Sequence, residues 1–186
     1  RLQNYARDNM HILSPRSRAG IKANQAGQEF ESTFRNLCDQ YGLCCWSASK
    51  LFSVRWQLRN ARKGKPEYLD KESYEERLAQ LEGEYTKVPD RAKEIANKVS
   101  DSSGFPDFLV WGDGGDLTRF VEEHSDGLQR RGSVLIVEVK YTTDPDETAY
   151  FTDDQKERIP ELRELEADVY IFRGTSEEYW LKRPSL

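Results

Sequence analysis

Two apolar stretches of the chain are interrupted by charged residues. The first, GFPDFLVW (104–111), carries Asp107 directly after Pro106, and the second, SVLIVEVKY (133–141), carries Glu138 and Lys140. A charge inside such a stretch costs several kcal/mol unless it is paired or bound to an ion. We therefore expect these three side chains to be held around a ligand.

The spacing of Glu138 and Lys140 places both side chains on one face of a strand, because neighbouring residues of a strand point to opposite faces. The carboxylates of Asp107 and Glu138, once they converge, repel each other unless a cation lies between them, and oxygen ligands with open water positions suit Mg²⁺ or Mn²⁺. A lysine beside that metal can orient a water or stabilise a developing oxyanion. The chemistry expected of such a set is phosphodiester hydrolysis; the alternative is an ordinary exposed ion pair on an edge strand.

The segment FPDFLVW followed by VLIVEVKY resembles the PD-(D/E)XK nuclease superfamily, over roughly residues 27–173. The junction-resolvase-like and virus-type replication-repair nuclease branches are the most similar. The resemblance implies a restriction-endonuclease-like α/β fold and a Mg²⁺- or Mn²⁺-dependent deoxyribonuclease. It further implies that Asp107, Glu138 and the carbonyl of Val139 bind the metal, and that Lys140 positions or activates the water.

The same resemblance calls for an acidic residue on the first helix, for which Glu29 and Glu31 compete. At about 100° per residue they lie on opposite flanks of the apolar stripe of that helix. Glu31 shares its flank with the small residues Gly27 and Cys38, which let another element approach. We therefore assign the acidic position to Glu31, as a metal ligand directly or through water, and Glu29 to the surface.

Gln155, in the segment TDDQKERI, has two predicted roles. The resemblance places a glutamine near the metal site at the start of the helix after the Glu-X-Lys strand. The pattern Thr152-X-X-Gln155 also matches a capping box, in which the glutamine side chain bonds back to the Thr152 amide. Both roles stay open at this point, and Pro160 is expected to kink the helix or make it restart.

The predicted fold is α/β, a mixed sheet of four or five strands flanked by helices, with a helical insertion. We expect a basic N-terminal arm at 1–22 and a nuclease domain at 23–186, of which 50–100 is a basic, helical insertion. The chain begins with Arg rather than Met, which leaves room for an upstream segment. Helices are predicted at 23–42, from Asp70 to about 86, at 89–99 and at 152–166; strands at 105–111, 134–141 and twice within 168–183; a strand or helix start at 43–58; and a loop or hairpin at 112–132.

Charge is distributed unevenly along the chain. The net charge is −5, yet residues 1–65 hold 12 Lys and Arg against 4 Asp and Glu. The segment KLFSVRWQLRNARKGK (50–65) has six basic residues and no acidic one, and basic segments with aromatic residues are typical of phosphate-contacting surfaces. The alternative is a solvated helix that pairs with the acidic half of the same chain. The candidate nucleic-acid contacts are Lys50, Arg55, Arg59, Arg62, Lys63 and Lys65.

The expected partner is DNA, cleaved in a structure-selective or weakly sequence-specific way during repair or recombination, and RNA stays open as a substrate. A homodimer is expected if two symmetric cuts are needed. The rival hypothesis is a binding or assembly subunit of a larger complex, attached through the N-terminal arm and without its own cleavage activity. No apolar run is long enough to span a bilayer, so no membrane partner is expected. The expected location is intracellular, in the cytoplasm, nucleus or nucleoid.

The remaining chemistry-bearing residues point to no other mechanism. Cys38, Cys44 and Cys45 match neither a zinc spacing nor an even disulfide set, and are expected to be reduced thiols. His11 and His124 stand in polar surroundings without an Asp or Ser partner pattern. Histidine-based catalysis is therefore not expected.

Overall fold

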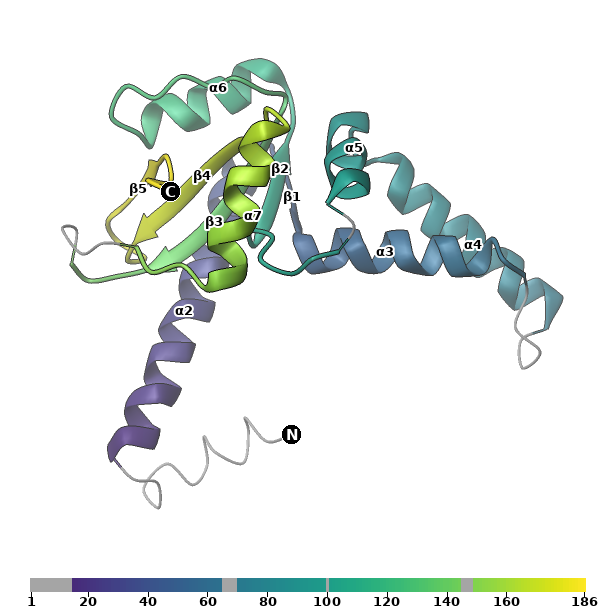
Figure 1. The fold of residues 1–186 in the computed structure, drawn as a ribbon, viewed down its shortest axis with the longest axis horizontal. Helices are drawn as coiled ribbons and strands as arrows, with labels where there is room; N and C mark the ends of the chain where they lie inside the picture. The colour runs from purple at the N-terminus through teal and green to yellow at the C-terminus, as the bar shows by residue number, and fades with distance from the viewer. Residues whose placement is uncertain (1–14, 65–69, 100, 145–148) are drawn as a thin grey trace.

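The computed structural model describes residues 15–64, 70–99, 101–144 and 149–186, with side chains from Gly20 onward. It contains a five-stranded sheet in the order β1-β2-β3-β4-β5, which is flanked by helices (Figure 1). Only β3 and β4 run parallel; the other neighbours are antiparallel. This confirms the predicted α/β fold with a mixed sheet. The strands are β1 (Cys44–Ser47), β2 (Phe108–Trp111), β3 (Val134–Tyr141), β4 (Asp168–Gly174) and β5 (Tyr179–Lys182).

The described part of the chain contains six helices. Helix α2 is longer than predicted and includes residues 15–22 of the expected arm, whereas residues 1–14 lie outside the described residues. Helix α7 continues through Pro160 rather than restarting there. None of the described helices is long and apolar enough to cross a membrane. The helices are α2 (Pro15–Gln40), α3 (Ala48–Ala61), α4 (Lys71–Thr86), α5 (Asp90–Lys98), α6 (Gly114–Glu123) and α7 (Asp153–Glu164).

The loop or hairpin predicted at 112–132 is wrong, because this segment contains α6. Leu117, Phe120 and Val121 are buried and recur at helical spacing, and the Asp113 carboxylate accepts a hydrogen bond from the Gly115 amide at 2.7 Å. The two glycines and the surrounding charges conceal this short apolar face. Its burial against the sheet outweighs the weak helix propensity of the glycines.

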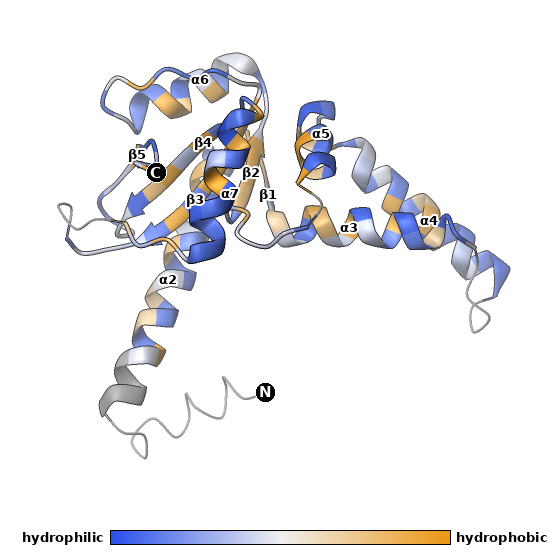
Figure 2. Ribbon diagram, in the orientation of Figure 1, coloured by the Kyte–Doolittle hydropathy of each residue, from blue (hydrophilic) through white to orange (hydrophobic). Residues whose placement is uncertain are grey.

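Helices cover both faces of the sheet because β3 is apolar on both sides. Val137 faces a core shared with Phe34 of α2 and Phe120 of α6. Ile136 faces the opposite core, shared with Ile159 of α7. Every residue of β2 is buried, and Figure 2 shows this strand as hydrophobic along its length. Glu138 is thus an acidic residue in a buried part of the sheet.

Helices α3, α4 and α5 lie between β1 and β2 in the chain, and α3 with α4 extends away from the sheet as a helical arm (Figure 1). The arm has a small core of its own, formed by Val54, Leu58 and Leu81. Its first residue is tied to the sheet, because the Ala48 amide donates to the Asp107 carbonyl at 2.8 Å. The arm therefore starts beside one of the predicted site residues.

Candidate active site

Asp107 and Glu138 lie side by side at one end of neighbouring strands. Phe108 pairs with Val137 in the antiparallel register, so the residue before β2 lies opposite Glu138. Pro106 cannot donate to the ladder, which fits its place just ahead of the strand. The Asp107 Oδ2 atom accepts a hydrogen bond from the Val139 amide at 2.8 Å. The two strands thus hold the two carboxylates together.

Glu138 is almost completely buried, with 3% of its side chain exposed. Its Oε1 atom lies 2.6 Å from Lys140 Nζ and accepts a hydrogen bond from Gln155 Nε2 at 2.7 Å. Its Oε2 atom is buried and has no hydrogen-bond partner among the described residues. A buried carboxylate oxygen without a partner is costly, and it is available to a cation.

Gln155 forms the predicted capping box and also contacts the charged pair on β3, while its role beside a metal stays a prediction. The Thr152 hydroxyl accepts from the Gln155 amide at 3.3 Å, and Gln155 Oε1 accepts from the Thr152 amide at 3.2 Å, which forms the capping box. The same side chain reaches Glu138, and its Oε1 atom lies 3.4 Å from Lys140 Nζ. One glutamine thus joins the start of α7 to the charged pair on β3.

The site carries excess negative charge. Burial, then the neighbouring charges of Glu138 and Glu31, raise the pKa of Asp107 to about 7, against the opposing effects of the Val139 amide and Lys140. A carboxyl with this pKa is about half protonated at neutral pH. A bound cation would relieve the repulsion that raises it.

Glu31, rather than Glu29, faces this site. Together with Asp107 and Arg35, it lines an open groove of about 290 Å³ on the side of α2 nearest the strands. Its side chain is 42% exposed and lies 4.0 Å from Arg35. Glu29 is exposed and does not line the groove. Helix geometry assigned the acidic position to Glu31 and placed Glu29 at the surface, and the structure puts Glu31 in the groove and Glu29 outside it.

No group of three or more His, Cys, Asp and Glu side chains forms a ready-made metal cage in the described ranges. Mg²⁺ does not need one, because it usually keeps several waters and binds through one or two protein carboxylates. Asp107 and Glu138, with the free Oε2 atom of Glu138, fit that requirement. Glu31 stands further out and suits a contact through water, and the Val139 carbonyl stays a predicted ligand.

No family model, curated protein or solved structure matches this chain. Function is therefore inferred from the residues and their geometry.

Two of the predicted nucleic-acid contacts are paired within the chain. Lys50 Nζ lies 3.5 Å from Glu84, and Arg62 lies 3.2 Å from Glu82, both on α4. For these two residues the alternative reading, in which basic and acidic halves pair, describes the structure better. Exposed pairs of this kind contribute little stability, so either cation can exchange its partner for a phosphate.

The other basic candidates differ in whether their side chains already contact another part of the described chain. Arg55 donates to the Ala96 carbonyl at the end of α5, which fixes its guanidinium between two helices. The side chains of Arg59 and Lys63 are exposed and form no ion pair or hydrogen bond with a described residue. Lys65 lies outside the described residues.

Three features of the site were not found from the sequence. The Val139 amide donates a hydrogen bond to Asp107. Phe151, just before α7, places its ring 5.8 Å from Lys140 Nζ. Arg35 lies in the groove one helical turn after Glu31, and this spacing of four residues was a usable signal.

Proposed function

We propose that this protein is a Mg²⁺- or Mn²⁺-dependent endonuclease that hydrolyses DNA phosphodiester bonds, with the site arrangement of PD-(D/E)XK nucleases. One observation carries the proposal: Glu138, buried in the sheet next to Asp107, keeps one carboxylate oxygen without a described partner while Lys140 and Gln155 hold the other. A purely structural ion pair gains nothing from a free buried oxygen. A metal site uses it.

Asp107 and Glu138 would hold the metal, with Glu31 acting through water. The metal, when bound, supplies a hydroxide-like water and neutralises charge on the phosphate. Lys140 Nζ is held by Glu138 and lies near Gln155, so its remaining N–H groups can donate hydrogen bonds that orient the attacking water or stabilise a phosphate oxygen. Gln155 keeps this ammonium in place through the bonds that begin α7. Arg35 can contact the phosphate next to the scissile bond.

The decisive experiment is a cleavage assay with Mg²⁺ or Mn²⁺ on duplex, single-stranded, flap and four-way-junction DNA, with a ribonucleotide strand for comparison. We expect the wild type to cut, and Glu138→Gln and Lys140→Met to lose at least about 100-fold in rate. Glu31→Gln and Glu29→Gln form a matched pair on one helix. Only the former should slow cleavage, and equal effects of the two would contradict the assignment of Glu31.

The second candidate function, a nucleic-acid-binding or assembly subunit, is favoured by one observation. Lys140 already neutralises Glu138 in the described structure, as it would in a site that never binds metal. This candidate predicts DNA binding that metal does not change and no cleavage in either metal. Isothermal titration of Mn²⁺ separates the two functions, because the subunit should release no heat of binding and Glu138→Gln should not alter its titration.

A further inference from the structure

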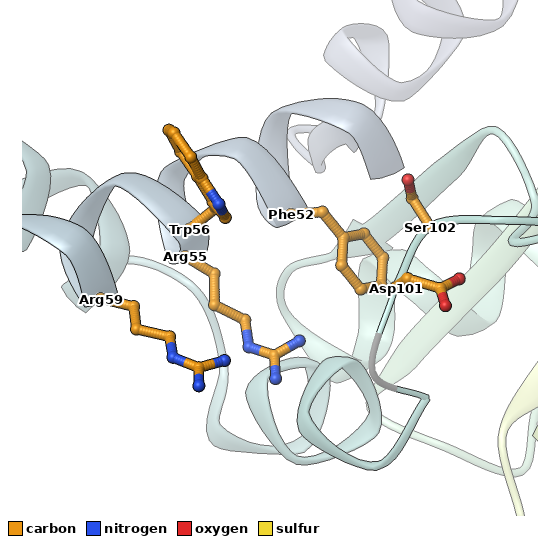
Figure 3. A pocket seen from close by; sticks show the side chains of 6 residues that line it. All are labelled: Phe52, Arg55, Trp56, Arg59, Asp101 and Ser102. Atoms are coloured by element: carbon orange, nitrogen blue, oxygen red, sulfur yellow. The ribbon is translucent and has the colours of Figure 1, made fainter.

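Trp56 is the most exposed of the described tryptophans, with 66% of its surface accessible, on the arm helix α3. An exposed tryptophan offers a flat aromatic face on which a base can stack, and neighbouring arginines add positive charge. Beside it is an open pocket of about 280 Å³, and Figure 3 shows α3 side chains on one side and the loop before β2 on the other. The pocket is lined by Phe52, Arg55, Trp56, Arg59, Asp101 and Ser102.

The pocket carries a net positive charge although Asp101 lines it. The Asp101 carboxylate lies 3.2 Å from the guanidinium of Arg158 and accepts a hydrogen bond from the Ser103 amide at 2.9 Å. Its negative charge is therefore compensated by Arg158, which does not line the pocket. The Arg59 side chain forms no ion pair or hydrogen bond with any described residue. The available charge of the pocket is therefore cationic.

The pocket adjoins the groove of the candidate active site. Ser102 lines both hollows, and Asp107 lines the second. The ring of Phe52, from the pocket, contacts the ring of Phe105, from the groove, with centroids 5.3 Å apart. Asp107 follows Ser102 by five positions in the sequence, which is at most about 18 Å of chain. A ligand a few nucleotides long can occupy both hollows.

We propose that this pocket binds an unpaired nucleotide, with its base stacked on Trp56 and its phosphate on Arg59, and that the strand continues past Ser102 to Asp107. The inference rests on the proposed function and names its substrate class: DNA with a single-stranded segment, such as a flap or a splayed arm. In a duplex the faces of the bases are covered by their neighbours, so an aromatic side chain reaches only unpaired or displaced bases.

The test is a binding measurement with the full chain in EDTA, where no cleavage occurs, on a labelled oligothymidylate, a duplex of equal length and a duplex with a single-stranded flap. Trp56→Ala should weaken binding of the oligothymidylate and the flap about 5- to 100-fold and leave the duplex unchanged, whereas Trp56→Phe should keep most of the affinity. Oligothymidylate should quench tryptophan emission in the wild type and much less in Trp56→Phe.

The charge of the pocket is tested on the same oligothymidylate. Arg59→Ala should lower the salt dependence of binding by about 0.7 in slope, the contribution of one single-strand phosphate contact. Lys71→Ala, which removes a charge paired with Glu75 at the start of α4, should not change it. Melting temperatures of all variants should match the wild type, since these side chains are exposed.

The outcomes separate this inference from the proposed function. Binding that depends on Trp56 without cleavage in any metal supports the inference and overturns the enzyme. Cleavage of plain duplex at the rate of the flap, unaffected by Trp56→Ala, supports the enzyme and overturns the inference. Absence of binding to any single-stranded form also overturns the inference.

Discussion

Replacing Asp107 by asparagine should make the metal-free protein more stable at neutral and alkaline pH. The pKa of Asp107 is raised from 3.8 to about 7, chiefly by burial and then by the charge of Glu138. The native state therefore holds this proton more tightly than the unfolded chain. The stabilisation that the proton provides is complete below pH 3.8 and is lost as the pH rises through 7.

The magnitude follows from the shift. Each pKa unit corresponds to about 1.36 kcal/mol, so ionised Asp107 destabilises the native state by up to about 4 kcal/mol at pH 8. Asparagine has the same shape, cannot ionise, and can still accept the Val139 amide through its Oδ1 atom. Asp107→Asn should raise the free energy of unfolding by about 2–4 kcal/mol at pH 8 and leave it unchanged near pH 4. For a chain of this length, 2 kcal/mol raises Tm by about 4–8 °C.

Urea denaturation in EDTA between pH 4 and pH 9 measures this difference. Asp153→Asn is a control whose effect on stability should have the opposite sign. The hydrogen bond from Lys156 lowers the pKa of exposed Asp153, so removing the Asp153 carboxylate should slightly destabilise the protein above pH 4. Mn²⁺ at ten times its Kd should add about 1.4 kcal/mol to the wild type and nothing to Asp107→Asn. The reasoning is refuted if Asp107→Asn is no more stable than the wild type at pH 8, or if its advantage is the same at every pH.

Three further substitutions give distinct outcomes. Gln155→Glu keeps a capping residue but places a carboxylate against Glu138, so we expect unchanged helix content by circular dichroism and a loss of cleavage, whereas equal activity would contradict the role of the amide. Lys140→Met leaves the buried Glu138 without its cation and should lower the free energy of unfolding in urea at pH 8 by about 3 kcal/mol; no loss would show that the pair is not formed. Gly104→Ala adds a Cβ 2.2 Å from the Asp154 carbonyl at a φ of +64°, so thermal unfolding should show a loss of about 3 kcal/mol or more, and an unchanged Tm would contradict the close approach.

Much of the site could be predicted because it depends on local periodicity. Glu138 and Lys140 share a face because strand residues alternate, and the buried run around them identifies β3. The capping box of α7 is a four-residue pattern, and it positions Gln155. Asp107 follows the same logic, since a proline marks the point at which a strand can begin.

The rest depends on which distant segments meet, and no local pattern contains that information. Lys50 stands in a purely basic segment, yet it lies beside Glu84, 34 residues later. Only the packing of α3 against the loop before β2 makes Trp56 part of a pocket with Ser102. The three buried residues of α6, Leu117, Phe120 and Val121, were visible in the sequence, but the glycines and charges around them suggested a loop. The segment is a helix because these residues pack against the sheet.

The hydrogen bond from the Ala48 amide to the Asp107 carbonyl fixes the start of α3 next to Asp107, so positions along α3 lie at set distances from that residue. Trp56 comes eight residues after Ala48, which is about 12 Å along a helix axis. One end of that interval is bonded to Asp107, the proposed metal ligand, and the other carries Trp56, the proposed stacking partner of an unpaired base. Under the two proposals, the helix sets the distance between the pocket that binds the unpaired base and the site that cleaves the strand. This distance does not depend on the DNA sequence, so the products should end at a constant number of nucleotides from the first unpaired base.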